Sequence, residues 1–390
     1  MRPLTASRPK PMVPVADRPL VAHTIDAAVD AGASRLVLVV GYEADAVRSY
    51  FGDSYRGVPV TFAVQTEQRG TADAVRVAAT ELDDGPFVVL NGDALYDTPS
   101  LTRLYESGPA VGSYRVDNPS SYGVLVTDGD GDGSDGGEIR VTGVIEKPAE
   151  PPSNLINTGA YHFPGEAQAW LDVGESERGE LELTDVLERT CNAFDVQAVA
   201  FERWLDVGRP WELLAANEWK LDELSSRIDG TVADDAVLEG DVVVEAGARI
   251  RSGVVIDGPA LVRQGATVGP NAYVRGATVV GEGAKVGHAV EVKNAVLMEG
   301  ATVGHLSYVG DSVLGREVNF GAGTKVANLR HDGADVKLTV KGERVSTGRR
   351  KLGVVVGDGV KTGINASLNA GVVLSEGSRV APGEVVTRDR

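Results

Sequence analysis

The sequence predicts two domains of different architecture: an α/β layered domain in the N-terminal half and a parallel β-helix in the C-terminal half. Two patterns lead to this prediction. Segments with helical and strand periodicity alternate through the first half, and every sixth residue from Val232 to Met298 is apolar. A length of 390 residues agrees with two or three domains. We place the first domain at residues 1–222, a linker at 223–230 and the second domain at 231–390.

The period of six is the main observation for the C-terminal domain. Between its two ends it is carried by Leu238, Val244, Ile250, Ile256, Val262, Val268, Val274, Val280, Val286 and Val292. Such a period is typical of a parallel β-helix, in which each short strand sends one aliphatic side chain into a central stack. The phase then shifts by one residue to Val303, and we place this shift at residues 304–308. The period resumes at Val356 after residues 330–352, which we expect to form a charged, hairpin-like arm.

The N-terminal half combines helices with short strands rich in β-branched residues. The expected elements are helices at residues 20–32 and 71–82, strands at 36–40, 58–64 and 87–90, and a closing helix at 211–226. This alternation is typical of a layered domain with a mostly parallel sheet, in which ligands bind beyond the carboxyl ends of the strands. Asp93 follows the third strand, so we expect it to face a ligand or a metal ion. Thr184 and Asp185 are expected to cap a later helix.

Composition limits the classes of function and partner. The net charge is −18, which argues against nucleic acids and anionic membranes as partners and would suit a salt-loving host. Cys191 is the single cysteine, so no internal disulfide can form and a cytoplasmic location is expected. No apolar run approaches the ~18 residues of a membrane span. The Asp/Gly-rich run at residues 128–135 lacks the ligand spacing of a calcium loop, and we interpret it as a solvated hairpin tip.

Further motifs follow one another along the N-terminal half. Residues 1–20 form a proline-rich loop whose Arg2, Arg8 and Lys10 would suit phosphate groups, with a charged surface loop as the alternative. The other motifs are Gln65 to Ala72, Tyr122-Gly123, Glu146-Lys147-Pro148, Asn157-Thr158-Gly159 and Trp204 to Gly208. In this order they resemble the sugar-1-phosphate nucleotidylyltransferase family over residues 1–220.

This resemblance implies a Rossmann-like fold and a role for each matching residue. Lys10 would contact the phosphates, and the nucleotide base would be held by Gln65, Gly70 and Thr71. Mg²⁺ would be bound by Asp93 and Asp206. The sugar phosphate would be held by Gly123, Glu146, Lys147, Asn157 and Thr158. Such a set fits phosphoryl transfer, which needs charge neutralisation and positioning more than a covalent catalyst.

The sequence departs from the family at its start. Pro3-Leu4-Thr5 and Pro9-Lys10-Pro11 match the second half of the family's opening motif, whereas the first β-strand and the glycine-rich part of the phosphate loop are absent. Backbone N–H groups of that loop would cradle the nucleotide phosphates. We expect Met1 to be an internal methionine of the motif that was taken as the start, because every downstream motif is present.

The C-terminal motifs carry a second resemblance. Residues 291–293, 304–311 and 319–324 resemble the acyltransferase domain of the bifunctional N-acetylglucosamine-1-phosphate uridylyltransferase/glucosamine-1-phosphate acetyltransferase family, in an archaeal-like form, over residues 231–390. The resemblance implies a left-handed β-helix and a homotrimer with sites between subunits. His305 would be the general base, and the acceptor sugar phosphate would be held by Arg275, Lys293, Tyr308, Asn319 and Asn328. The phosphates of acetyl-CoA would meet Arg349, Arg350 and Lys351.

Histidine chemistry supports one of these roles independently. The imidazole of histidine titrates near neutrality, so His305 could deprotonate an ammonium group that attacks a thioester. His288 keeps the regular period, and we expect it to be a structural residue at a corner of the β-helix.

The two resemblances together predict a bifunctional enzyme of nucleotide-sugar biosynthesis. One half would transfer a nucleotidyl group from UTP or dTTP to a sugar 1-phosphate with Mg²⁺, and the other would acetylate glucosamine 1-phosphate from acetyl-CoA. Three alternatives stay open at this point. They are a nucleotidylyltransferase with a purely structural β-helix, an acetyltransferase alone because the N-terminal loop is missing, and a non-catalytic subunit that binds sugar nucleotides.

Overall fold

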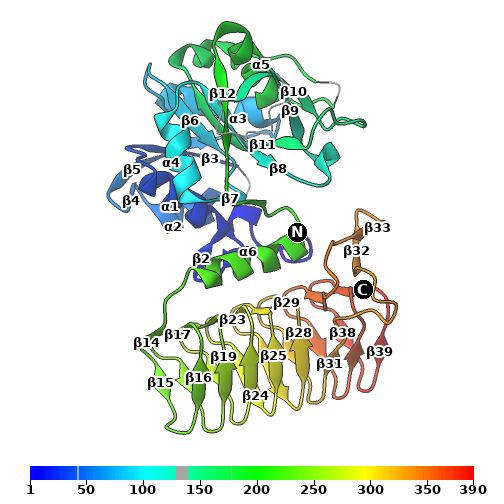
Figure 1. Ribbon diagram of the computed structural model, residues 1–390. Helices are drawn as coiled ribbons and strands as arrows, with labels where there is room; N and C mark the ends of the chain where they lie inside the picture. The colour runs from blue at the N-terminus through cyan, green and yellow to red at the C-terminus, as the bar shows by residue number, and fades with distance from the viewer. Residues whose placement is uncertain (42–43, 129–138, 177) are drawn as a thin grey trace. The chain divides into compact units, whose positions relative to one another are not determined.

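The computed structural model describes residues 1–41, 44–128, 139–176 and 178–390. The chain divides into two compact units, Leu20–Asp206 and a second unit that joins Met1–Pro19 to Val207–Arg390 (Figure 1). This division differs from the boundaries expected from the sequence because residues 1–19 and 207–222 pack with the β-helix. The position of the domain boundary along the chain therefore stays a prediction. Most of the Asp/Gly-rich run expected to form a hairpin tip lies outside the described residues.

The unit Leu20–Asp206 contains the expected alternation of helices and strands. Its described helices are α1 (Leu20–Asp30), α2 (Ala44–Phe51), α3 (Thr71–Ala78), α4 (Thr98–Glu106) and α5 (Leu183–Ala193), with short 3-10 turns η2 (Ala79–Glu81), η3 (Pro119–Ser121) and η4 (Gly165–Trp170). Its described strands are β3 (Leu36–Val40), β4 (Ser54–Tyr55), β5 (Val58–Val64), β6 (Phe87–Leu90), β7 (Ala94–Tyr96), β8 (Ala110–Arg115), β9 (Gly123–Thr127), β10 (Ile139–Glu146), β11 (Leu155–Phe163), β12 (Val196–Ala200) and β13 (Trp204–Asp206). The three strands and the two first helices expected from the sequence are confirmed.

The sheets of this unit are more mixed than expected. Among the described residues, the largest sheet has the order β6-β11-β8-β12-β10-β9, and only the β12–β8 pair in it is parallel. The prediction of a mostly parallel sheet is therefore wrong for this sheet, although β3 and β5 do pair in parallel. The sheet β3-β5-β4 shares no described strand with the larger one. Strand composition predicts that a segment is a strand but does not set the direction of its partner.

Burial of apolar side chains holds these layers together. One cluster packs α3 and α5 against the large sheet through Val75, Val186 and Leu187, and another packs α1 and α4 through Ala28 and Leu101. The expected helix cap at Thr184 and Asp185 is wrong, because α5 begins at Leu183 and its N-cap residue is Glu182. The backbone N–H of Leu183 instead donates to Thr71 Oγ1 at 2.9 Å.

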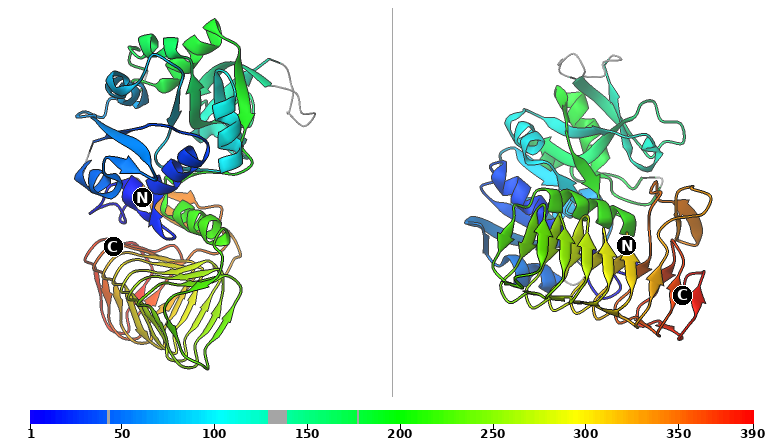
Figure 2. Two further views of the ribbon diagram at one scale, coloured as in Figure 1. Left: turned by 90° about the vertical axis from the view of Figure 1, so that its left-hand side faces the viewer. Right: turned by 60° about the horizontal axis from the view of Figure 1, so that its bottom comes forward.

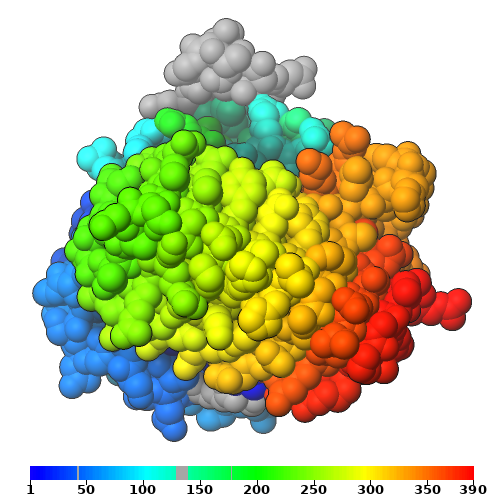
Figure 3. Space-filling model, turned by 90° about the horizontal axis from the view of Figure 1, so that it is seen from below, coloured from blue at the N-terminus to red at the C-terminus, as the bar shows by residue number. Residues whose placement is uncertain are grey.

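The C-terminal half is a parallel β-helix with three long sheets (Figures 1 and 2). In the described chain the first sheet contains β14 (Arg227–Ile228), β17 (Val242–Val244), β20 (Ala260–Val262), β23 (Thr278–Val280), β26 (Val296–Leu297), β29 (Val313–Leu314), β34 (Val355–Val356) and β37 (Val373–Leu374). The second contains β15 (Thr231–Val232), β18 (Arg249–Ile250), β21 (Thr267–Val268), β24 (Lys285–His288), β27 (Thr302–His305), β30 (Asn319–Phe320), β35 (Lys361–Thr362) and β38 (Arg379–Val380). The third contains β16 (Val237–Glu239), β19 (Val255–Asp257), β22 (Tyr273–Arg275), β25 (Glu291–Lys293), β28 (Tyr308–Gly310), β31 (Lys325–Val326), β36 (Ser367–Leu368) and β39 (Val385–Val386). The surface of this prism is seen end to end in Figure 3, from green to red.

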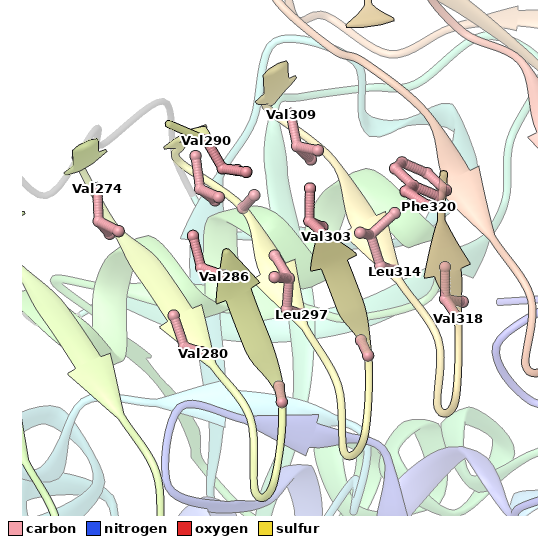
Figure 4. Packing of buried hydrophobic residues seen from close by; sticks show 14 of the residues in the cluster. Val274, Val280, Val286, Val290, Leu297, Val303, Val309, Leu314, Val318 and Phe320 are labelled. Carbon is pink, nitrogen blue, oxygen red and sulfur yellow. The ribbon is translucent and has the colours of Figure 1, made fainter. Parts of the chain in front are cut away.

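The apolar stack inside the β-helix confirms the period of six but corrects the position of its phase shift. Val280 pairs in register with Leu297, and Leu297 with Leu314, so Leu297 and not Met298 belongs to the stack (Figure 4). The shortened steps therefore run from Val292 to Leu297 and from Val309 to Leu314. Both occur at the same corner of consecutive coils, between the third and the first sheet. The expected position at residues 304–308 is wrong, because apolar Met298 next to Leu297 concealed the shift in the sequence.

The arm and the N-terminal segment complete the second unit. Strands β32 (Lys337–Val340) and β33 (Glu343–Ser346) form an antiparallel hairpin, which confirms the expected arm. The N-terminal segment contains η1 (Lys10–Met12), β1 (Pro14–Val15) and β2 (Arg18–Pro19), and helix α6 (Pro210–Asp222) contacts both β1 and β23. Figures 1 and 2 show α6 lying along the β-helix. Among the described residues, every helix is too short or too polar to cross a membrane.

Candidate active sites

Two aspartates occupy neighbouring backbone positions where β7 pairs with β13. Asp93 directly precedes β7, and Asp206 ends β13 opposite Ala94 in the antiparallel register. Both side chains are partly exposed. In the described part of the chain no group of three His, Cys, Asp or Glu side chains forms a ready metal cluster. Two carboxylates fit Mg²⁺ nonetheless, because this ion keeps several of its water ligands and takes oxygen donors.

Tyr96 connects this carboxylate pair to the predicted sugar-phosphate residues. Its buried hydroxyl accepts from the backbone N–H of Asn91 and lies 3.2 Å from the carbonyl oxygens of Thr158 and Gly159. Burial, together with the charges of Asp93 and Asp206, holds the pKa of Tyr96 well above its ordinary value. The phenol therefore stays protonated and can donate to these carbonyl groups. Tyr96 is not recognisable from the sequence as a site residue, because an aromatic residue in a buried strand gives no separate signal.

The predicted sugar-phosphate residues lie close together on β9, β10 and β11. Gly123 pairs in register with Glu146, and a Cβ atom added at Gly123 would lie 2.9 Å from Glu146 Oε2. The same Cβ would lie 3.8 Å from Asn157 Cβ, so these three residues line one place. Lys147 follows Glu146 and contacts its carboxylate, with Nζ 3.6 Å from Oε1. A side chain at position 123 would fill this space, which explains the glycine.

The irregular part of β11 at residues 157–159 is fixed by its own polar groups. Asn157 Nδ2 donates to the hydroxyl of Tyr161 at 2.6 Å, and Asn157 Oδ1 accepts from the N–H of Gly159 at 2.8 Å. Thr158 Oγ1 is buried and has no hydrogen-bond partner among the described residues. Gly112 makes room for it, since a Cβ there would lie 2.3 Å away. A buried hydroxyl without a partner is costly, so it is suited to a ligand or an ordered water.

The predicted nucleotide residues are also brought together. Gln65 follows β5, and Gly70 and Thr71 begin α3. Gln65 Nε2 donates to Gly70 O at 3.2 Å and to Asp73 Oδ2 at 2.8 Å. The bond from Gln65 is the largest cause of a lowered pKa at Asp73, which is buried and also paired with Arg76. Asp73 thus fixes the Gln65 side chain, a contact that the local sequence does not reveal.

Lys10 belongs to the other compact unit. It opens η1, and its carbonyl oxygen accepts from the N–H of Val13 at 3.1 Å. Nearby, Ser7 Oγ donates to Asp358 Oδ2 at 2.7 Å and accepts from Arg316 Nη2 at 2.6 Å. This segment is therefore fastened to the β-helix. Asp93 and Asp206 are in the unit Leu20–Asp206, so the contact of Lys10 with phosphates stays a prediction.

His305 ends β27 on the second sheet of the β-helix, and its side chain is exposed. Its carbonyl oxygen accepts from Ser307 Oγ at 2.8 Å and from the N–H of Gly323 at 2.9 Å, so its backbone is fixed. His288 is paired in register with His305 on the preceding coil. The two histidines therefore occupy equivalent positions, which the sequence period concealed. An exposed imidazole on a fixed backbone can accept a proton from a bound substrate.

Three predicted acceptor residues converge on the third sheet. Lys293 and Tyr308 come from β25 and β28, and Asn328 follows β31. Asn328 Nδ2 donates to the Tyr308 hydroxyl at 3.1 Å, and Lys293 Nζ lies 3.0 Å from the carboxylate of Asp311. Arg275 is in register with Lys293 one coil earlier and binds Glu291 through Nε and Nη2.

The remaining predicted C-terminal residues are placed differently. Asn319 lies on the second sheet with His305, since it pairs with Thr302. Arg349, predicted to meet acetyl-CoA, forms a two-pronged ion pair with Glu218 of α6. Arg350 and Lys351 are exposed at the base of the arm. The described contacts therefore leave two of these three cations open to solvent.

Both halves of the chain are similar to known proteins. Residues 1–223 match the family model described as nucleotidyl transferase, and residues 256–377 match the one described as GMPPB C-terminal domain. The chain is 38% identical to a bifunctional sugar-1-phosphate nucleotidylyltransferase/acetyltransferase of Sulfurisphaera tokodaii, over 100% of this chain and 94% of that protein. It is also 38% identical to the bifunctional protein GlmU of Methanocaldococcus jannaschii, over 100% and 92%. A solved structure of UDP-glucose pyrophosphorylase with UDP-glucose shares the fold over 57% of this chain, with a TM-score of 0.51 and 22% identity.

The fold and the clustered residues define a nucleotidyltransferase domain joined to a parallel β-helix of hexapeptide repeats. The chain belongs to the family of bifunctional sugar-1-phosphate nucleotidylyltransferase/acetyltransferases.

Proposed function

We propose that this chain catalyses two transfers that lead to an acetylated nucleotide sugar. Its first domain joins a nucleotidyl group from UTP or dTTP to a sugar 1-phosphate, and its β-helix moves an acetyl group from acetyl-CoA to glucosamine 1-phosphate. Full-length similarity to bifunctional relatives supports the pair of activities. Uridine diphosphate N-acetylglucosamine is the expected product.

The pairing of β7 with β13 carries the proposal for nucleotidyl transfer, because it sets Asp206 beside Asp93. A phosphate oxygen of the sugar 1-phosphate attacks the α-phosphorus of the nucleotide, and pyrophosphate leaves. Bound Mg²⁺ would neutralise charge on the phosphates. Glu146, Lys147, Asn157 and Thr158 hold the sugar phosphate, Gln65, Gly70 and Thr71 hold the base, and Lys10 offsets phosphate charge.

Asp93→Ala tests this half. Pyrophosphate release from UTP and a sugar 1-phosphate should depend on Mg²⁺ and fall by about a hundredfold or more, since the variant loses a direct metal ligand. Release of CoA by the same variant should be unchanged, which controls for folding of the β-helix. Full pyrophosphate release by Asp93→Ala would refute the metal role.

The convergence of Lys293, Tyr308 and Asn328 carries the proposal for acetyl transfer. His305 takes a proton from the ammonium group of glucosamine 1-phosphate, and the resulting amine attacks the thioester carbonyl. The CoA thiolate leaves and is protonated. Arg275 and Lys293 hold the phosphate of the acceptor, Asn319 assists, and Arg349, Arg350 and Lys351 meet the phosphates of CoA.

His305→Ala tests this half. It should abolish the release of CoA from acetyl-CoA and glucosamine 1-phosphate, as followed with a thiol reagent, while pyrophosphate release stays at the wild-type rate. His288→Ala is the matched control, because His288 has the equivalent position on the preceding coil and no assigned role. Wild-type CoA release by His305→Ala would show that another group is the base.

The oligomeric state and the cellular location belong to the same proposal. A homotrimer agrees with the exposure of His305, since a neighbouring β-helix would complete the acceptor site. Light scattering of the purified protein should give three times the chain mass of 40.8 kDa. A cytoplasmic location and a salt-rich host are supported by the single cysteine and by the net charge of −18.

A further inference from the structure

The β-helix corner at which the step is five residues instead of six contains a buried carboxylate with no assigned role. The shortened steps after Val292 and Val309 bring Asn294 and Asp311 to equivalent corners of consecutive coils. Both residues have positive φ, 46° and 49°, a conformation that Asn and Asp tolerate better than most side chains. Asp311 is only 3% exposed, whereas the interior beside it consists of aliphatic side chains.

The Asp311 carboxylate accepts hydrogen bonds from three side chains. Lys293 Nζ lies 3.0 Å from Oδ2, Asn294 Nδ2 lies 3.0 Å from Oδ1, and Asn328 Nδ2 lies 2.5 Å from Oδ2. A buried carboxylate is costly unless it is paired and hydrogen-bonded, so these donors must stay in place around it. Two of the three, Lys293 and Asn328, are predicted to bind the acceptor.

The hydrogen-bond network around Asp311 also includes Tyr308. The Tyr308 hydroxyl accepts from Asn328 Nδ2, which leaves its own proton for another acceptor. Burial first, and then the charge of Asp311, raise the pKa of Tyr308, so its phenol stays protonated. Gly310 permits this close packing, since a Cβ there would lie 2.4 Å from the Tyr308 hydroxyl and 2.7 Å from Asn328 Nδ2.

We propose that Asp311 is the positioning residue of the acceptor site and holds the Lys293 ammonium and the Asn328 amide where they receive an amino-sugar 1-phosphate. This role rests on the acetyl transfer proposed above. Lys293 has three N–H donors and is held through the carboxylate of Asp311, so donors remain for the phosphate. Asp311 itself is enclosed by its partners and acts through them.

The same network reaches helix α6. Asn294 Nδ2 also donates to Glu218 Oε1 at 2.8 Å, and Glu218 binds Arg349. Glu218 is thus an outer member of the network, separated from Lys293 by Asn294 and Asp311. Glu218→Gln should therefore change acceptor binding less than a substitution of Asp311.

Asp311→Asn is the direct test, because it keeps the shape and removes the charge. KM for glucosamine 1-phosphate should rise by about tenfold to a hundredfold, the range for hydrogen bonds to charged groups. KM for acetyl-CoA and the rate of pyrophosphate release should not change. A merely structural role would not single out one substrate. If Asp311→Asn does not fold, Asp311→Glu, which displaces the charge by one methylene, must raise the same KM.

Glu245→Gln is the matched control. Glu245 also forms an ion pair on the same β-helix, with Arg263 Nε at 2.9 Å, but it follows β17, three coils before the coil that contains Asp311. Glu245→Gln should leave the KM for glucosamine 1-phosphate and the KM for acetyl-CoA at the wild-type level. An unchanged KM for glucosamine 1-phosphate in Asp311→Asn, or an equal rise in Glu245→Gln, would overturn the positioning role.

A double-mutant cycle separates this inference from the proposed function. The melting-temperature changes of Asp311→Asn and Lys293→Met should not add, because either substitution already breaks their contact. If wild-type protein releases no CoA, the proposed acetyl transfer fails, and the cycle still tests the network. Additive changes in melting temperature would then overturn it.

Discussion

Single polar atoms fix the backbone around the candidate nucleotidyl site. The Tyr96 hydroxyl lies between the N–H of Asn91 and the carbonyl groups of Thr158 and Gly159, and the indole N–H of Trp204 donates to Thr158 O at 3.0 Å. The irregular part of β11 that contains Asn157 and Thr158 is therefore held from the strands next to Asp93 and Asp206. These contacts, together with those of Asn157 itself, keep this part of the strand in one conformation.

Tyr96→Phe should loosen this part of β11. The variant leaves two carbonyl groups and one N–H without this partner, so we expect a loss of about 1–3 kcal/mol in the free energy of unfolding and a higher KM for the sugar 1-phosphate. Urea unfolding and pyrophosphate release would measure the two effects. Tyr105→Phe is the control, since the Tyr105 hydroxyl has no hydrogen-bond partner among the described residues. Equal losses in the two variants would contradict the role of Tyr96.

Asp73 gives a prediction for acid stability. Its pKa is lowered in the folded chain, so its stabilising effect is present above the ordinary value of 3.8 and is lost as the pH falls through the lowered value. Wild type should melt above Asp73→Asn at neutral pH, and the difference should shrink below pH 3.8. Thermal melts of both proteins across this window would check it. A difference that grows on acidification would refute the assignment.

At this scale the sequence predicted residue types better than contacts. Gln65, Asn157 and Lys293 were found because each stands in a motif, and the structure places them in clusters. Asp73 and Tyr96 were missed because a buried aspartate or tyrosine has the same local pattern whether it supports a site or only the core. Contacts between strands that are distant in the sequence determine which of the two roles such a residue has, and the local sequence does not reveal these contacts.

Among the elements, the start of α3 shows how backbone geometry positions a binding residue. Gly70 has φ +126°, and a Cβ added there would lie 2.3 Å from Leu181 O. The loop before α5 therefore passes directly over the first turn of α3. Thr71 extends this contact through its bond with the N–H of Leu183.

Gly70→Ala and Gly32→Ala separate strain from steric clash. Gly32 has a similar φ of +109° but no atom within 4 Å of an added Cβ. Gly32→Ala should lower the free energy of unfolding by about 1 kcal/mol through backbone strain alone. Gly70→Ala should cost more in urea unfolding and should also slow pyrophosphate release, because the clash displaces Gln65 and Thr71. Equal losses in the free energy of unfolding of the two variants would show that the close approach of Leu181 does not require a glycine at position 70.

The β-helix was the element most readily predicted from sequence. Its period of six depends on one side chain per strand entering the stack, so composition and spacing carry the whole pattern. The corner shift was misplaced because Met298 is apolar and kept the count of six one step too long. The mostly parallel sheet was wrong because strand patterns do not encode partner direction.

At the scale of the whole molecule, the net charge of −18 bears on stability. Acidic residues outnumber basic ones by 56 to 38, so repulsion between them opposes the folded state at low ionic strength. Added salt screens this repulsion.

The melting temperature should therefore rise as KCl is increased from about 0.1 M, where the screening length is about 10 Å, to about 1 M, where it is about 3 Å. Thermal melts in a KCl series would measure it, and the uncharged osmolyte sucrose at equal osmolality is the control for general exclusion effects. A melting temperature that is independent of KCl would contradict the role of self-repulsion.

Coupled synthesis in one reaction tests the central claim most directly. Purified protein with glucosamine 1-phosphate, acetyl-CoA, UTP and Mg²⁺ should produce a nucleotide sugar that carries the acetyl group, identified by mass spectrometry. His305→Ala and Asp93→Ala should each fail alone and should recover the product when mixed, because each retains one activity. Acetylated sugar phosphate without any nucleotide sugar, or nucleotide sugar without acetylation, would contradict a bifunctional enzyme.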